Sequence, residues 1–352
     1  MSCAMGQKLY SDWLHSSCVL KRGEEDLSHH RREIFIKQWN RTIVTEVFIN
    51  GFESVVDYKI PIFLVLLIFY ILTCLENCLV IFLVCRSPRL HSPMYIFVSN
   101  LLFVELAYAT DMTPSMLFNV LSSRVTISYV GCLVQLNVLS WMGIVDILQI
   151  TVMSYDRYLA ICHPLRYSVL MHNRLCLYFL IVFWVLSAVL TAGYFYLFGQ
   201  LEYCAPVKMN FFFCEYTAFV HFACVMANLD TLELYGFIIA TILNLFCGFI
   251  FLSYIVIIIA ILRIRSATGR QKAFSTCSSH LLVVVIHFLI PFLAFIVPQT
   301  IISYKTMSIV YYLVIPVLNP VIYTLRNQEF QNALQATRKD INQYFMAKRV
   351  LP

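Results

Sequence analysis

The chain has 352 residues, of which 60% are hydrophobic and 12% are charged, and its formal net charge is +6. Typical soluble domains are about 45–50% apolar and about 25% charged, so this composition excludes an ordinary soluble protein. The basic residues cluster in particular segments. We therefore interpret the positive charge as a signal of membrane topology and not as a nucleic-acid interface.

Residues 1–59 precede the first long apolar run and are predicted to form an extracellular tail. Asn40 opens the triplet Asn40-Arg41-Thr42, a glycosylation acceptor sequence that fits an outside location. Residues 1–35 contain no apolar core of a signal peptide, so we expect the first membrane span to act as its own insertion signal.

Seven apolar runs are long enough to cross a bilayer, whose core requires about 20 apolar residues of helix. Their residues are continuously apolar and do not alternate as in a strand, and in lipid a lone segment must satisfy its own backbone as a helix. The predicted fold class is therefore all-α, a seven-transmembrane helix bundle over residues 60–325. The predicted spans are 60–84, 94–116, 130–154, 176–199, 232–262, 278–298 and 306–325.

The orientation follows from the Lys and Arg residues near the ends of the spans, which favour the cytoplasmic side. The loops after spans one, three and five and the tail after span seven are rich in these residues, whereas the opposite loops carry only Arg124, Lys208 and Lys305. We expect a multi-pass plasma-membrane protein in contact with lipid, with its N-terminus outside and its C-terminus in the cytoplasm.

The cytoplasmic segment 326–352 is predicted to begin with a short helix after span seven. Within 326–345, the apolar residues Phe330, Leu334, Ile341 and Phe345 stand among polar ones, a pattern typical of an amphipathic helix on the inner membrane surface. The alternative is a solvated tail.

An acid and a base, Asp156 and Arg157, stand side by side at the end of span three. Ionisable residues at a membrane helix are costly and need a partner. Asp156 can neutralise Arg157 locally, and Arg157 can also reach a neighbouring helix, so the pair is predicted to form a latch. The plain alternative is an interfacial anchor at a cytoplasmic helix end.

The longer string around this pair, "MSYDRYLAICHPLRY" (153–167), resembles the third-helix signature of olfactory receptors, a branch of the rhodopsin-like G-protein-coupled receptors. Four further strings resemble motifs of that family in the family's order, and the resemblance covers about residues 40–340. They are "TEVFINGF" (45–52), "LHSPMYIFVSNLLFVEL" (90–106), "SYIVIIIAILRIRSATGRQKAFSTCSSHL" (253–281) and "PVLNPVIYTLRN" (316–327).

Some positions depart from the family pattern. Residues 1–38 exceed the family's short N-terminus and are either a genuine extension, which could be disordered, or the result of an incorrectly chosen start. Glu76 stands where Gly is usual, Glu105 where Asp is frequent and Asp146 where Glu is frequent. The last two keep a carboxylate, so their chemistry is expected to survive with a changed reach.

The resemblance implies a receptor, and not an enzyme, that binds a small, mostly apolar odorant and activates a heterotrimeric G protein of the stimulatory olfactory type, raising cyclic AMP. Activation would move the inner ends of spans five and six. The alternative is an olfactory-type or other receptor of the same superfamily that senses a metabolite outside the olfactory tissue. The residues implied in coupling and switching are Asp156, Arg157, Tyr158, Tyr254, His280, Asn319, Pro320 and Tyr323.

Four cysteines, one at the start of span three and three in the loop after span four, allow three pairings that sequence alone cannot distinguish. They are Cys132, Cys204, Cys214 and Cys224. The resemblance implies the disulfides Cys132–Cys214 and Cys204–Cys224. A metal site using His221 and Cys224 is the rival hypothesis, which no clear four-ligand set supports.

Polar residues recur at mid-membrane depth on four spans, and mutual contact is expected because each is costly alone. They are Asn77, Glu105, Asp146 and Asn319. The resemblance implies a site for water or a sodium ion near Glu105 and Asp146. A static hydrogen-bonded cluster is the alternative to one that rearranges during switching.

The ligand pocket is expected in the outer halves of spans three, five, six and seven, whose side chains there are mostly apolar and aromatic. The expected lining residues are Leu136, Leu139, Ser140, Gly143, Ile238, Ile239, Phe288, Phe292, Phe295 and Tyr312. Each could equally be a packing residue. His287 is the one ionisable candidate, with packing the more frequent role of such a histidine.

A transporter or channel and a membrane enzyme are the rivals from other classes. Transporters often show repeated halves and helices broken near the midplane, and neither is evident. No phosphate-binding glycine loop, nucleophile elbow or His-Glu-x-x-His motif appears in the sequence.

Overall fold

The computed structural model is almost entirely helical. It describes residues 44–52, 57–122, 125–203, 206–223, 227–296, 301–325 and 328–350. Asn40, Cys204 and Cys224 lie outside these ranges, so the predicted glycosylation site and the second predicted disulfide do too.

The seven predicted spans are present as helices. They are α3 (Lys59–Arg86), α4 (Pro93–Leu121), α5 (Tyr129–Cys162), α7 (Asn173–Gly199), α9 (Ala227–Leu262), α10 (Ala267–Ile296) and a seventh span in three parts, α11 (Ile301–Ile309), η3 (Val310–Val314) and α12 (Ile315–Leu325). In the described part of the chain, six helices are long and apolar enough to cross a membrane, and α10 contributes a shorter apolar stretch, Cys277–Ile290. This architecture confirms the predicted seven-helix membrane bundle.

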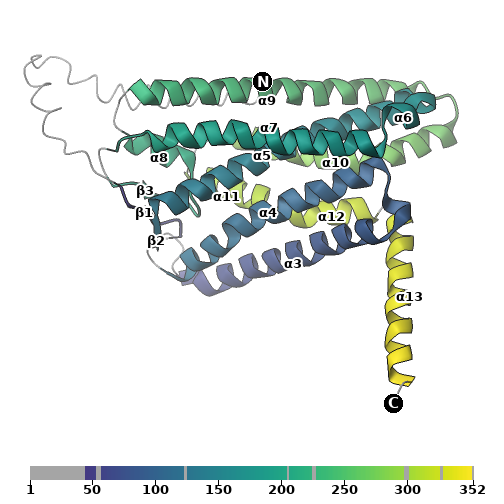
Figure 1. Ribbon diagram of the computed structural model, residues 1–352, viewed down its shortest axis with the longest axis horizontal. Helices are drawn as coiled ribbons and strands as arrows, with labels where there is room; N and C mark the ends of the chain where they lie inside the picture. Colours follow the sequence, from purple (N-terminus) through teal and green to yellow (C-terminus); the bar gives the residue numbers. More distant parts are fainter. Residues whose placement is uncertain are drawn as a thin grey trace, which may run out of the picture.

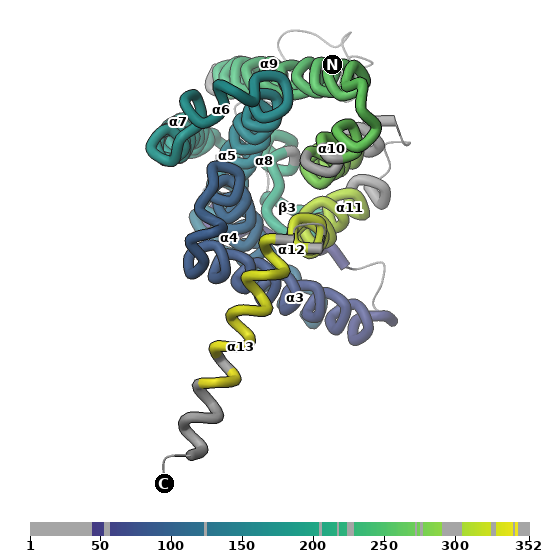
Figure 2. Tube along the Cα trace, turned by 90° about the vertical axis from the view of Figure 1, so that its right-hand side faces the viewer, coloured from purple at the N-terminus to yellow at the C-terminus, as the bar shows by residue number. Residues whose placement is uncertain are grey.

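The spans lie side by side as one bundle, with the short strands at one end and the last helix at the other (Figure 1). Seen along the bundle, α5 lies centrally, and it packs against α4, α7 and α9 (Figure 2). The outward faces are apolar: α3, for example, exposes Leu64, Ile68 and Leu75. Apolar outward faces of this kind are suited to lipid, because lipid chains are themselves apolar and offer no hydrogen bonds.

A small sheet covers the outer end, where the sequence analysis expected only a tail and loops. Strand β1 (Glu46–Ile49) lies between β2 (Val125–Ser128), with which it is antiparallel, and β3 (Lys208–Met209), with which it is parallel. Val47 and Ile49 are fully buried. The motif "TEVFINGF" therefore joins the N-terminal segment to two loops at this end of the bundle, beside the short helix α8 (Tyr216–Phe222).

A buried lysine of the seventh span is hydrogen-bonded to the segments that flank this small sheet. Lys305 is 9% exposed, and its Nζ donates to the carbonyl oxygen of Gly51 at 2.8 Å and to Oδ1 of Asn210 at 2.7 Å. The ammonium also lies 5.2 Å from the centre of the Phe212 ring. A Cβ at Gly51 would stand 2.4 Å from the Phe211 carbonyl oxygen, so only glycine allows this approach.

The inner end holds the short elements η2 (Pro88–Leu90) and α6 (Pro164–Leu170) and the long helix α13 (Gln328–Val350). Helix α13 runs at a right angle to the spans, along the direction of a membrane surface (Figure 1). Phe330 anchors it, packing edge-on against Tyr95 at 5.2 Å, and Tyr95 donates to the Glu329 carboxylate at 2.9 Å. The amphipathic segment is thus a helix that starts at 328 and extends past the predicted end at 345; contact with the inner leaflet stays a prediction.

Candidate functional site

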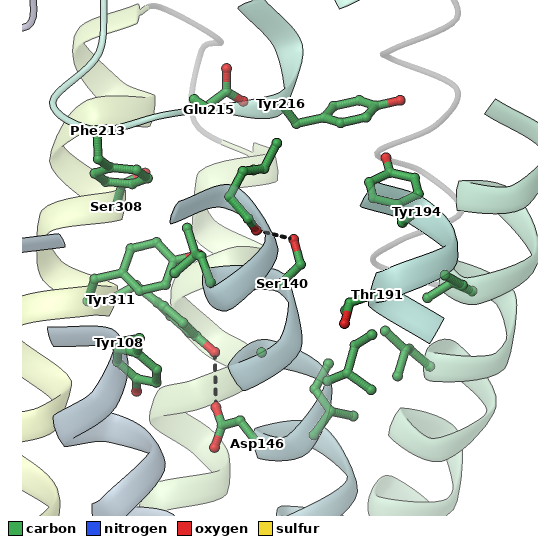
Figure 3. Close-up of a pocket in the computed structure, with 18 of the residues that line it drawn as sticks. Tyr108, Ser140, Asp146, Thr191, Tyr194, Phe213, Glu215, Tyr216, Ser308 and Tyr311 are labelled. Atoms are coloured by element: carbon green, nitrogen blue, oxygen red, sulfur yellow. Dashed lines mark hydrogen bonds between the residues drawn. The ribbon is translucent and has the colours of Figure 1, made fainter. Parts of the chain in front are cut away.

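A cavity of about 560 Å³ opens in the outer half of the bundle, within the size range of small-molecule sites. Helices α4, α5, α7, α9 and α10 and the seventh span form its walls, and residues Phe213–Tyr216, which lead into α8, cover it (Figure 3). Its lining is mainly apolar and aromatic, as the sequence predicted.

Six of the predicted lining residues do line this cavity. They are Leu136, Leu139, Ser140, Gly143, Ile239 and Tyr312. The first four recur along α5 at positions 136, 139, 140 and 143, which is the helical spacing that puts them on one face. Their binding role stays a prediction, because lining a cavity does not by itself identify a ligand.

The structure corrects the placement of two others. Ile238 is 48% exposed on the outside of α9 and is not in the cavity wall, because its neighbour Ile239 takes the inward position and successive helical residues point about 100° apart. Phe288 is also absent from the wall and packs against Phe251, with ring centres 5.4 Å apart. The side chains of Phe292 and Phe295 lie outside those that the structure describes.

The cavity is more polar than the sequence analysis expected. Asp146, predicted only as a member of the central cluster, forms part of the wall near the tyrosines of the seventh span, and Glu215 reaches it from the loop. No sequence signal placed Glu215 at the cavity, because its position depends on the path of the loop. The further lining residues that the prediction missed include Tyr108, Thr191, Tyr194, Tyr216, Ser308 and Tyr311.

The loop is held over the cavity by a disulfide between Cys132, at the outer end of α5, and Cys214. Their Cα atoms are 5.5 Å apart and both residues are completely buried. Gln135, one turn along α5, accepts from the Cys214 backbone N–H at 3.0 Å. The disulfide pairing that the resemblance implied between span three and the loop is confirmed.

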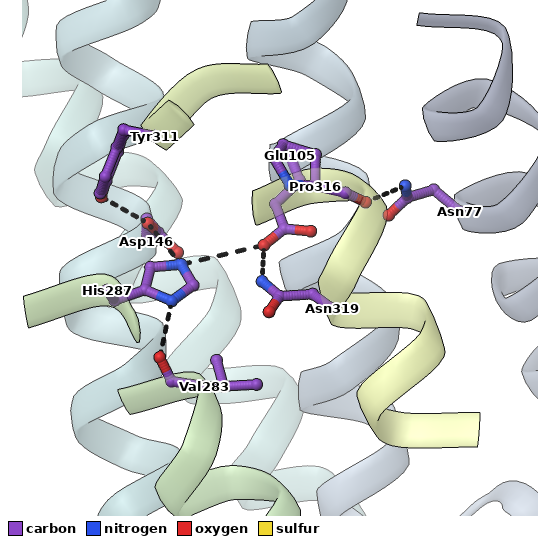
Figure 4. A network of polar contacts seen from close by, with 8 residues as sticks. All are labelled: Asn77, Glu105, Asp146, Val283, His287, Tyr311, Pro316 and Asn319. Atoms are coloured by element: carbon purple, nitrogen blue, oxygen red, sulfur yellow. Dashed lines mark hydrogen bonds and ion pairs between the residues drawn. The ribbon is translucent and has the colours of Figure 1, made fainter. Parts of the chain in front are cut away.

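Below the cavity, the buried polar residues form a network with one unexpected member (Figure 4). Asn319 donates to Glu105. His287 lies between the two carboxylates, its Nε2 3.9 Å from Glu105 Oε1 and 3.7 Å from Asp146 Oδ2, so it joins groups that do not meet directly. The fourth predicted member, Asn77, contacts the seventh span instead.

That contact follows from a proline. Pro320 has no N–H, so the carbonyl four residues earlier, at Pro316, lacks its helical partner. Asn77 Nδ2 donates to this oxygen at 2.9 Å and to the Thr73 carbonyl at 2.8 Å. The irregular turn η3 directly precedes this segment, so the polar cluster borders the least regular part of the seventh span.

At the inner end of α5, Asp156 and Arg157 form a buried ion pair. Arg157 Nε donates to Asp156 Oδ2 at 2.9 Å, and Arg157 Nη2 contacts the same oxygen. Tyr167 of α6 donates to the other carboxylate oxygen at 2.7 Å. Burial, followed by the Asp156 charge, raises the pKa of Tyr167, so its phenol remains a donor.

Two neighbouring helices meet beside this pair. Tyr254 of α9 is hydrogen-bonded to Nδ1 of His280 of α10, and both side chains are buried. Tyr323, near the end of α12, is buried, and its hydroxyl has no hydrogen-bond partner in the part of the chain that the structure describes. Tyr158 instead turns to His163, at 3.1 Å. Tyr254, His280 and Tyr323 are thus near enough to Arg157 to interact with its charge. Asn319 lies in the polar network below the cavity, with Pro320 next to it.

Over the described residues, no group of three or more His, Cys, Asp or Glu is arranged to hold a metal ion. His221 is exposed, and its suggested partner Cys224 lies outside the described ranges. A sodium ion or water near Glu105 and Asp146 stays a prediction of the resemblance.

Comparison with known proteins identifies the family. The family model described as olfactory receptor matches residues 66–339. Olfactory receptor 2A12 of Homo sapiens is 38% identical over 84% of this chain and 96% of its own length, and olfactory receptor 5G26 of Mus musculus is 40% identical over 85% and 94%. Olfactory receptor-like protein OLF3 of Canis lupus familiaris is 38% identical over 84% and 94%. The chain therefore belongs to the olfactory receptors, G-protein-coupled receptors of seven membrane helices and not enzymes.

Proposed function

We propose that this receptor binds a small organic odorant in the cavity and, in response, activates a stimulatory olfactory-type G protein that raises cyclic AMP. The carrying observation is that one helix, α5, bears both the cavity wall from Leu136 to Ile147 and the buried pair of Asp156 and Arg157. A ligand at one end of a shared rigid element can bias groups at the other.

The proposed switch has two arrangements. In the resting one, Arg157 stays paired with Asp156 and the inner ends of α5, α9 and α10 remain together through Tyr254 and His280. The odorant binds the form with separated inner ends more tightly, and this differential affinity shifts the population. A complete shift from 1:99 to 99:1 requires about 5.5 kcal/mol, so weak ligands act as partial activators.

Exposed apolar residues on α6 support a docking role for this end. Leu165 is 94% exposed and Val169 is 75% exposed, directly beside the Asp156–Tyr167 contact. Leu165 and Val169 stand four residues apart, on one face of α6, so together they offer a partner a small apolar patch. The basic loops on the same side complement an acidic partner surface.

The Lys and Arg residues of the loops also support the proposed membrane and orientation of the receptor. Those next to the inner helix ends favour a plasma-membrane receptor with its N-terminus outside and its C-terminus in the cytoplasm. Epitope tags at each end, stained before and after cell permeabilisation, test this orientation. A C-terminal tag stained on intact cells would contradict it.

The function is tested by expressing the full chain in cells with the stimulatory olfactory-type G protein and measuring cyclic AMP against a panel of volatile and water-soluble compounds. We expect at least one compound to raise cyclic AMP, and expect Leu165→Glu to weaken that response without changing surface staining. Responses carried by ion flux or current, with cyclic AMP unchanged, would contradict the proposal.

A further inference from the structure

The charges around the cavity all have one sign. Asp146 and Glu215 both line it, and among the lining residues that the structure describes there is no Lys, Arg or His. Figure 3 shows the two residues at opposite ends of the cavity, Asp146 at the floor and Glu215 on the loop, with the Glu215 carboxylate directed away from the cavity. Low-dielectric walls focus the electric field of the two carboxylates, so the cavity favours a positively charged ligand.

The carboxylate at the floor is incompletely satisfied. Asp146 is 1% exposed, and its Oδ1 has no hydrogen-bond partner within the described chain. Its Oδ2 is 3.5 Å from the Tyr311 hydroxyl and 3.7 Å from His287 Nε2, both longer than a strong hydrogen bond to a carboxylate. A buried carboxylate without a close donor is strongly disfavoured, so this position is suited to a donor that the ligand brings.

Aromatic rings surround the approach to Asp146. Tyr312 packs edge-on against Tyr108 at 5.8 Å, Phe213 at 5.7 Å and Tyr311 at 5.0 Å, measured between ring centres, and all four line the cavity. Ring faces attract cations, most strongly where water is excluded. The same rings also accept the apolar body of a ligand, which fits the mainly apolar remainder of the wall.

Glu215, the carboxylate on the loop, is less deeply buried than Asp146. Glu215 Oε2 accepts from the Ala218 backbone N–H at 3.3 Å, at the start of α8, and the residue is half-buried. It is therefore already engaged and partly hydrated. Its charge attracts a cation towards the covered end of the cavity, while Asp146 is the deeper and drier partner.

We propose that the cavity takes a small organic amine in its protonated form, with the ammonium on Asp146 and the apolar body against α5 and the tyrosines. This inference names the ligand class of the function proposed above and rests on that function for its cellular readout. Two assignments compete with this one: the sodium ion or water that the resemblance implies near Glu105 and Asp146 occupies the position, or His287, 3.7 Å away, is the partner of Asp146. Either would leave the cavity with no preference for cations.

The test uses amines and their matched neutral alcohols: isopentylamine with isopentanol, cyclohexylamine with cyclohexanol, and 2-phenylethylamine with 2-phenylethanol. Binding is followed by the thermal stabilisation of the purified full-length receptor, and signalling by cyclic AMP in cells. We expect one or more amines to bind at least about tenfold more tightly than the matched alcohol, the factor for one charge-assisted hydrogen bond.

Single substitutions test whether the preference for amine over alcohol depends on Asp146. Asp146→Asn should reduce the amine-to-alcohol ratio to near one, Asp146→Glu should retain a preference, and Asp111→Asn should leave the ratio unchanged. Asp111→Asn is the matched control because it makes the same substitution on α4, outside the cavity wall. Comparing the two ligands within each variant cancels any effect of the substitution on expression or on the switch.

The outcomes separate this inference from the proposed function. Stabilisation by amines with no cyclic AMP response would support the amine site and contradict the G-protein assignment. Equal binding of amine and alcohol, binding of neither, or a preference that survives in Asp146→Asn would overturn the amine site, whatever the signalling result.

Discussion

Replacing Asp156 with Asn should turn the receptor partly on without ligand. The substitution keeps the size of the side chain and removes the charge that holds Arg157 Nε at 2.9 Å in the resting arrangement. Both residues are buried, at 1% and 7% exposure, so water replaces little of what is lost. A hydrogen bond to a charged group contributes about 1.5–3 kcal/mol, and this contribution is lost from the resting form alone.

The expected rise in the active population of Asp156→Asn follows from this loss. A loss of about 1.5–3 kcal/mol shifts the equilibrium by about 13-fold to about 160-fold, which raises an active population of about 1% to about 11–60%. Basal cyclic AMP, divided by surface expression, measures this population. The matched control is Asp340→Asn, which breaks an ion pair with Arg86 at 3.3 Å on the same side of the bundle, but one that is more than half exposed on both partners. An exposed pair contributes about 0–1 kcal/mol, so the control should stay near wild type.

An Asp156→Asn receptor that reaches the surface normally and shows unchanged or lower basal cyclic AMP would refute the idea that the pair restrains activation. A rise of the same size in Asp340→Asn would refute the reasoning from burial, since both variants lose one carboxylate charge.

Three further predictions follow. Arg157→Ala should abolish odorant-dependent cyclic AMP while surface staining persists; a full response would contradict the latch. Cys214→Ser should strip surface expression or ligand response, because the disulfide to Cys132 closes a separation of 82 residues, a constraint of about 4 kcal/mol; normal delivery and response would contradict its role as a tie. Lys305→Met should lower the thermal midpoint of the purified receptor, because the carbonyl of Gly51 loses its buried donor at 2.8 Å, and an unchanged midpoint would show that the outer sheet does not depend on this lysine.

The positions of the spans were predictable because their cause is local. In lipid each helix must satisfy its own backbone, so a continuous apolar run of sufficient length is enough to identify it. The ends were predicted less well: span three was expected to stop at 154, whereas α5 continues to Cys162. Hydropathy marks the edge of the bilayer, but helical hydrogen bonds continue into the polar residues beyond it.

The cavity was partly predictable for a related reason. The helical period puts Leu136, Leu139 and Gly143 on one face of α5, and that face does line the cavity. The period alone cannot determine the rotation of α9, and so Ile238 was expected inward together with Ile239. Glu215 could not be assigned at all, because its position depends on a loop whose path is determined by the disulfide at Cys214.

The sequence by itself determined seven membrane helices, the family and the residue types at the inner switch, because these depend on runs and motifs contained within single segments. Only the tertiary structure decided which distant groups meet: that His287 lies between Glu105 and Asp146, that Lys305 joins Gly51 to Asn210, and that strand β1 completes a sheet. These contacts depend on the rotation and depth of each helix within the bundle, which the packing of all the spans determines together.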